Sequence, residues 1–138
     1  MEEAENGKAV LLFDLFGGII AKAIKEFGTR VPVSEAFWHI FGSALEEKYG
    51  DEYPQFFDDF TYGRGLGYSY IEQMAKLKRQ FFGTGKFHSY MGDPFYDIAP
   101  LAIECMDEIA TRELSEYKEI IAEMAAMFNQ EAWSWRKA

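Results

Sequence analysis

The stretch AVLLFDLFGGIIAKAIKEF (residues 9–27) decides the predicted fold, because its apolar residues recur with the period of an α-helix. On a helical projection, one broad apolar face comprises Leu12, Phe13, Phe16, Ile19, Ile20, Ala23, Ile24 and Phe27. The opposite side, which we expect to face solvent, carries Asp14, Gly18, Lys22 and Lys25. Gly28 follows at a position where helices commonly end. The pattern therefore predicts a core helix.

The same period continues downstream. Ser34 can cap a helix that ends before Gly50 and whose apolar stripe comprises Phe37, Trp38, Phe41, Ala44, Leu45 and Tyr49. A short helix is expected within DEYPQFFDDFTY (residues 51–62), and a further helix over residues 69–82, which Gly83 would stop.

The C-terminal third is expected to form one long helix or two stacked helices. Its apolar stripe comprises Ile98, Leu101, Ala102, Cys105, Met106 and Ile109, and then Tyr117, Ile120, Ile121, Met124, Met127 and Phe128. Arg112, Glu113 and Glu116 interrupt this stripe. Charged residues on an apolar arc predict a kink near residues 111–115.

The predicted class is all-α. No segment of strand length alternates apolar and polar residues. At 138 residues the chain fits one domain. We therefore expect a single-domain compact bundle of about five or six helices spanning residues 1–138, with a flexible N-terminus over residues 1–7.

Composition argues against a membrane protein or a secreted one. The apolar run at residues 9–21 is interrupted by Asp14 and is shorter than the ~20 residues that span a bilayer. The preceding MEEAENGK is acidic, whereas a signal peptide begins with basic residues. The single cysteine, Cys105, cannot form an internal disulfide. A cytoplasmic protein that does not bind membranes is expected.

No complete motif for catalysis, a metal or a nucleotide occurs. GRGLG (residues 63–67) and GTGKF (residues 83–87) are rich in glycine, but neither follows a predicted strand, as phosphate loops do. We interpret them as joints between helices, in which Gly65 and Gly83 take a positive φ. His39 lies on the polar side of its helix, and Cys105 in the core stripe. We therefore expect no cofactor, no metal and no catalytic residues.

The charge is unevenly distributed. The net charge is −9, yet residues 63–92 carry 5 basic residues and 1 acidic residue. In this region cations alternate with aromatic rings, as in sites for single-stranded nucleic acid. The candidate binding residues are Arg64, Tyr68, Tyr70, Lys76, Lys78, Arg79 and Lys86. The competing interpretation, which we favour, is that this basic segment neutralises the acidic terminal helices of the same chain.

Trp133 and Trp135 are the last candidates for binding a partner. They are two residues apart, so on one helix they point in different directions. Either the helix ends before them or one indole ring covers a neighbouring molecule. We expect a contact in a homo- or hetero-oligomer.

The predicted function is that of a non-enzymatic helical interaction protein: an adaptor, an assembly factor or an acidic inhibitor that binds another protein through an aromatic-rich face. The first alternative is a binder of single-stranded nucleic acid or of a phosphate ligand through residues 62–90. An enzyme of unrecognised type is the second alternative. The net charge of −9 disfavours nucleic acid.

Overall fold

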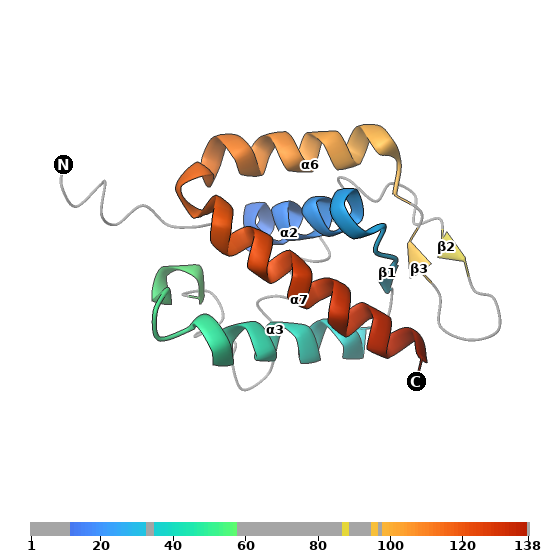
Figure 1. Ribbon diagram of the computed structural model, residues 1–138, viewed down its shortest axis with the longest axis horizontal. Helices are drawn as coiled ribbons and strands as arrows, with labels where there is room; N and C mark the ends of the chain where they lie inside the picture. Colours follow the sequence, from blue (N-terminus) through green and yellow to red (C-terminus); the bar gives the residue numbers. More distant parts are fainter. Residues whose placement is uncertain (1–11, 33–34, 58–86, 89–94, 97, 138) are drawn as a thin grey trace.

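The computed structural model describes residues 12–32, 35–57, 87–88, 95–96 and 98–137. These residues are mostly helical, as predicted. Four α-helices lie among them: α2 (Leu12–Phe27), α3 (Glu35–Tyr49), α6 (Pro100–Glu113) and α7 (Lys118–Lys137). Two 3-10 turns, η1 (Pro54–Phe57) and η2 (Ser115–Tyr117), adjoin them. Figure 1 shows α6 and α3 at opposite edges of the view, with α2 and α7 between them.

Helix α2 is central, because both α6 and α7 pack on it. Leu15 and Ala21, which lie outside the predicted apolar face, are as fully buried as Phe16. The predicted burial was wrong at two positions of α2. Gly18 was expected to face solvent but is buried where α2 meets α6, and Phe27 was expected in the core but is 48% exposed. A helix with neighbours on several sides buries more than one stripe.

Aromatic rings from three helices form the centre of the core. Phe41 of α3 and Phe128 of α7 meet edge to face with ring centroids 5.1 Å apart. Phe37 meets Trp38 at the same separation, and Phe16 of α2 lies 6.0 Å from Trp38. Edge-to-face pairs at these distances add about 0.5–1.5 kcal/mol each beyond the burial of area. These contacts link α2, α3 and α7.

Three very short strands stand where none was predicted. Strands β1 (Val31–Pro32), β2 (Phe87–His88) and β3 (Phe95–Tyr96) form an antiparallel sheet in the order β1-β3-β2. Val31 pairs with Tyr96, and Pro32 with Phe95. Each strand has two residues, which is too short to show an alternating pattern in the sequence. The indole N–H of Trp38 donates to the Pro32 carbonyl at 3.0 Å, which joins β1 to α3.

The C-terminal third forms two helices with a break where a kink was predicted. Leu114 ends α6 with φ −125°, and its N–H donates to the Ala110 carbonyl at 2.8 Å. Leu114 is only 4% exposed, so its apolar side chain is buried in the core at the break between α6 and η2. Cys105, predicted to lie in the core, is only half-buried, whereas its neighbour Met106 is buried.

The remaining predictions concern residues that the structure does not describe. They are the N-terminus (1–7), the helix cap at Ser34, residues 58–62 of the segment expected to hold a short helix, the helix over residues 69–82, the GRGLG stretch and residues 83–86 of the second glycine stretch. Among the described helices, none has the length and apolar character needed to cross a membrane.

Candidate functional site

Of the predicted binding residues, only Trp133 and Trp135 lie in a helix that the structure describes. Trp133 lies in α7 with 49% of its surface exposed. Trp135 lies in the same helix, but its side chain is outside the described residues. The helix therefore continues past both indoles instead of ending before them. Outside the described residues lie Arg64, Tyr68, Tyr70, Lys76, Lys78, Arg79 and Lys86.

Trp133 and Phe27 line one hollow at the C-terminal ends of α7 and α2. The hollow has a volume of about 170 Å³ and is also lined by Gly28, Thr29, Arg30, Asn129 and Ala132. Phe27 is 48% exposed and Trp133 49% exposed. Two large aromatic side chains from different helices are thus half in solvent on the same small surface. We call Phe27, Arg30 and Trp133 the aromatic surface.

The turn after α2 positions this surface. Gly28 takes φ +65°, a left-handed conformation that favours glycine, and its N–H donates to the Ile24 carbonyl at 2.9 Å. Thr29 Oγ1 lies 3.1 Å from the Ala23 carbonyl oxygen and 2.7 Å from Asn129 Oδ1. The buried threonine therefore connects the end of α2 to α7. As a result, Arg30, which follows the end of α2, lines the same hollow as Trp133.

Strand pairing places an aromatic ring beneath Arg30. Because Pro32 pairs with Phe95, β3 runs next to the turn. The guanidinium carbon Cζ of Arg30 lies 5.1 Å from the centre of the Phe95 ring, within the range of a cation–π contact. Among the described residues, no carboxylate forms an ion pair with Arg30. A second hollow of about 180 Å³ adjoins it, lined by Ile24, Thr29, Arg30, Val31, Phe95, Tyr96, Ile98 and Ile103.

A third hollow of about 180 Å³ lies between α2, α6 and α7. Its lining includes Lys22, Thr111, Ser115 and Lys118 around a floor of Gly18, Ala110, Leu114 and Ile121. Lys22 is paired with Glu26 at 3.2 Å. Sites for small molecules usually occupy about 300–1,000 Å³. Each of these three hollows is smaller, of a size that suits one side chain of a partner.

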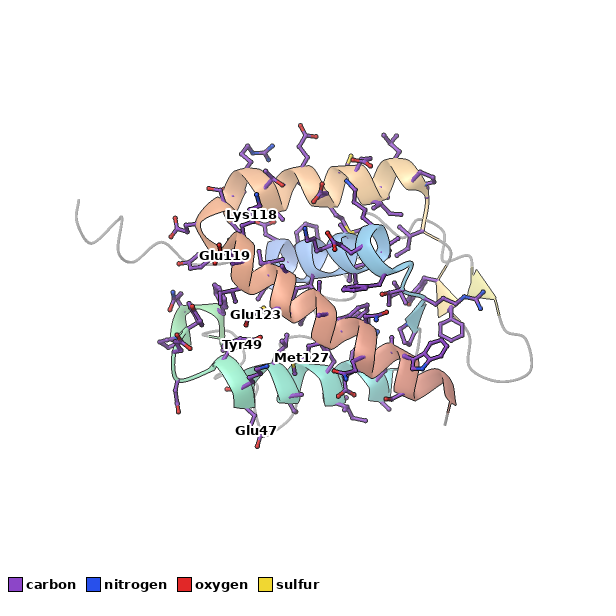
Figure 2. All side chains as sticks on the ribbon, in the orientation of Figure 1. Glu47, Tyr49, Lys118, Glu119, Glu123 and Met127 are labelled. Atoms are coloured by element: carbon purple, nitrogen blue, oxygen red, sulfur yellow. The ribbon has the colours of Figure 1, made fainter. Side chains whose placement is uncertain are left out.

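One polar cluster lies at the other end of α7. The hydroxyl of Tyr49 on α3 donates to Glu123 Oε1 on α7 at 3.1 Å, and Figure 2 shows the two residues beside each other. Burial, and then the hydrogen bond to Glu123, raise the pKa of Tyr49 to about 12. Nearby, Gln55 Nε2 donates to the Tyr117 hydroxyl at 3.2 Å. The hydrogen bond joins α3 to α7, and the raised pKa favours the protonated form of the tyrosine.

The acidic residues of α6 also have a structural role. Lys25 Nζ of α2 binds Asp107 at 2.9 Å and Glu104 at 3.2 Å. These hydrogen bonds, to Asp107 first and then to Glu104, raise the pKa of Lys25. In the part of the chain that the structure describes, no three histidine, cysteine or acidic residues converge as a metal site. His39 is half-buried on α3.

Comparison with known proteins assigns no family. No family model, no curated protein and no solved structure matches the chain. A functional inference therefore depends on the geometry of the side chains. The sequence identified Trp133 by its position, but it did not identify Phe27, which fitted the apolar period, or Arg30, which stands in an unremarkable turn.

Proposed function

We propose that this chain is a non-enzymatic interaction protein, such as an adaptor, an assembly factor or an inhibitor, that binds another protein through the aromatic surface. The observation that carries the proposal is the shared hollow of Phe27 and Trp133, each about half exposed, with Arg30 at its edge. Protein interfaces are enriched in Trp, Phe and Arg, and the few residues that carry most of the binding energy are often Trp or Arg.

The ordinary interpretation of an exposed apolar side chain is that it has no function, because single ones are common on protein surfaces. Ile40 on α3 and Leu101 on α6, at 49% and 75% exposure, fit that interpretation. Phe27 and Trp133 differ, because they come from two helices and line the same hollow beside an arginine. A partner that covers both rings would gain about 25 cal/mol for each Å² of apolar surface removed from water.

The proposal includes the expected setting of the protein. We propose that the chain forms a single domain, a bundle of five or six helices, and that it functions in the cytoplasm. The partner is a protein, either a second copy or a different chain. Binding of single-stranded nucleic acid through residues 62–90 is the alternative, and the net charge of −9 argues against it.

The experiment is a comparison of variants in affinity capture from cells that naturally contain the protein. Tagged wild-type protein, Phe27→Ala and Trp133→Ala are compared by quantitative mass spectrometry of the captured proteins. Ile40→Ala is the matched control, because Ile40 is exposed to the same extent on a different helix. We expect one protein to be captured by the wild type and by Ile40→Ala and to be lost with both aromatic variants. Equal capture by all four proteins would contradict the proposal.

Sedimentation separates the two kinds of partner. If the partner is a second copy, the wild type sediments as a dimer and the two aromatic variants as monomers at the same concentration. If the partner is a different chain, all proteins sediment alike. A dimer that persists in both variants would place the interface elsewhere.

A further inference from the structure

We infer that the aromatic surface binds a peptide segment of its partner in which a carboxylate stands next to an apolar side chain, with the carboxylate on Arg30. This inference rests on the proposed function and specifies the chemistry of the partner. It follows from three features of the surface: the environment of Arg30, the two hollows on either side of it, and the charges of the residues that line them.

Arg30 is exposed and is held in place by a ring. Its guanidinium carbon Cζ lies over the Phe95 ring, 5.1 Å from the ring centre. A guanidinium has five N–H donors in a plane, and an electrostatic contact with an aromatic ring supplies none of them with an oxygen acceptor. A carboxylate can accept two parallel hydrogen bonds from this group. Among the described residues no carboxylate pairs with Arg30, so none of them occupies these donors.

The hollows lie on both sides of this cation. Thr29 and Arg30 line both of them, so the two hollows are adjacent. Their volumes, about 170 and 180 Å³, correspond to roughly six water molecules each at ~30 Å³ per molecule. This space suits a single side chain beside the carboxylate. The lining combines aromatic rings with the polar residues Thr29 and Asn129, which suits a peptide that presents both side chains and main-chain amides.

Charge favours an acidic peptide over a nucleic acid. Among the described residues that line the two hollows, Arg30 is the only charged one. One cation suits one carboxylate, and none of the described lining residues is an acid that would repel it. A nucleic-acid site tracks a backbone with several cations, and proteins that bind DNA commonly make about 6–10 phosphate contacts.

A peptide selection tests this inference. A library of random peptides displayed on phage is selected for binding to the wild-type protein, and enriched peptides are synthesised and measured by fluorescence anisotropy against wild type and Arg30→Glu. We expect the enriched peptides to share an aspartate or glutamate next to an apolar residue. Arg30→Glu should weaken them at least roughly tenfold, because hydrogen bonds to charged groups are the stronger kind.

Charge reversal of the peptide is the more specific part of the test. A peptide with lysine in place of the acid should lose affinity for the wild type and regain it for Arg30→Glu. Arg112→Glu is the control, because Arg112 is exposed on α6 and lines neither hollow, and this change should leave affinity unchanged. Circular dichroism verifies that each variant is folded. A labelled single-stranded oligonucleotide is added as a competitor, and it should not displace the peptide.

Several results would overturn the inference. They are enrichment of peptides without an acid, enrichment of none, equal affinity for wild type and Arg30→Glu, or displacement by the oligonucleotide. Failure of this inference is distinguishable from failure of the proposed function. If Phe27→Ala and Trp133→Ala abolish partner capture while Arg30→Glu does not, the surface binds a protein but not through a carboxylate. If none of the three changes capture, the proposed function itself is wrong.

Discussion

Gly18 on α2 and Ala110 on α6 lie so close that a methyl group added to Gly18 would stand 2.6 Å from the Cβ of Ala110. Cβ atoms of folded proteins do not approach this closely, so Gly18→Ala must push the helices apart. Alanine favours a helix over glycine by about 1 kcal/mol, but overpacking a core costs about 1–3 kcal/mol. We expect chemical denaturation to show a net loss of stability.

The reciprocal variant is the control for this crossing. Gly18→Ala combined with Ala110→Gly moves the methyl group from one helix to the other. This double variant should recover part of the stability lost in Gly18→Ala. If Gly18→Ala instead stabilises the protein, helix propensity dominates and the described packing of α2 on α6 is wrong.

Two phenylalanines of α2 should differ in how much stability the protein loses when each is replaced by alanine. Phe16 is fully buried among aromatic rings, whereas Phe27 is 48% exposed. Phe16→Ala should lower the free energy of unfolding by about 3–5 kcal/mol. Phe27→Ala should change it by no more than about 0.5 kcal/mol, as for other surface positions. Thermal or urea denaturation measures both, and similar losses for the two would contradict the assignment of Phe27 to the surface.

Stability should fall at high pH through Tyr49. The pKa of Tyr49 is raised from 10.0 in the unfolded chain to about 12 in the folded protein, by burial and by Glu123. The folded state therefore holds this proton more tightly. The stabilisation is fully present below about pH 10 and is lost as the pH rises towards 12. The free energy of unfolding of wild type and of Tyr49→Phe, measured at a series of pH values, gives this contribution as the difference between the two.

Two variants define the origin of this pH dependence. Tyr49→Phe removes the hydroxyl and should cost about 0.5–1.5 kcal/mol at neutral pH, the usual contribution of one hydrogen bond. The difference from wild type should then shrink between pH 10 and 12. Glu123→Gln keeps an acceptor but removes the negative charge, so the wild-type dependence should become shallower. A constant difference between wild type and Tyr49→Phe at every pH would show that Tyr49 titrates normally.

The turn that carries Arg30 should depend on Gly28. At φ +65° a residue with a Cβ is strained by roughly 1–2 kcal/mol, although open space surrounds the position. Gly28→Ala should destabilise by about this amount. Gly28→Asn should cost less, because asparagine tolerates the left-handed region. Equal stability of all three proteins in urea would indicate that the turn takes another conformation.

The sequence predicted where the helices lie better than it predicted how they pack against one another. Helical periodicity and Gly28 located α2, and the charged residues near Arg112 located the break between α6 and α7. Periodicity measures one apolar stripe. It could not show that α6 and α7 both cover α2, so it placed Gly18 in solvent. Strand β1 has two residues and was missed, because its pairing with β3 joins segments more than sixty residues apart.

The candidate site was difficult to predict for the same reason, because it depends on contacts between residues that are far apart in the sequence. The spacing of Trp133 and Trp135 led to the prediction that one indole ring covers a neighbouring molecule, and this stays a prediction; Trp133 is 49% exposed. Phe27 fitted the apolar period of α2, but it occupies the last turn of the helix and is half in solvent. Arg30 becomes notable only when β3 brings Phe95 beneath it, 65 positions later in the chain.

Photo-crosslinking in cells tests most directly whether the aromatic surface binds a protein. Benzoylphenylalanine is placed at Phe27, which it resembles in shape, and at Ile40, the control with matched exposure. After irradiation, adducts are identified by mass spectrometry. Our account predicts one abundant protein adduct at Phe27 that is absent at Ile40 and reduced by Trp133→Ala. The account is contradicted by the absence of a protein adduct at Phe27, by the same adducts at both positions, or by crosslinking to nucleic acid.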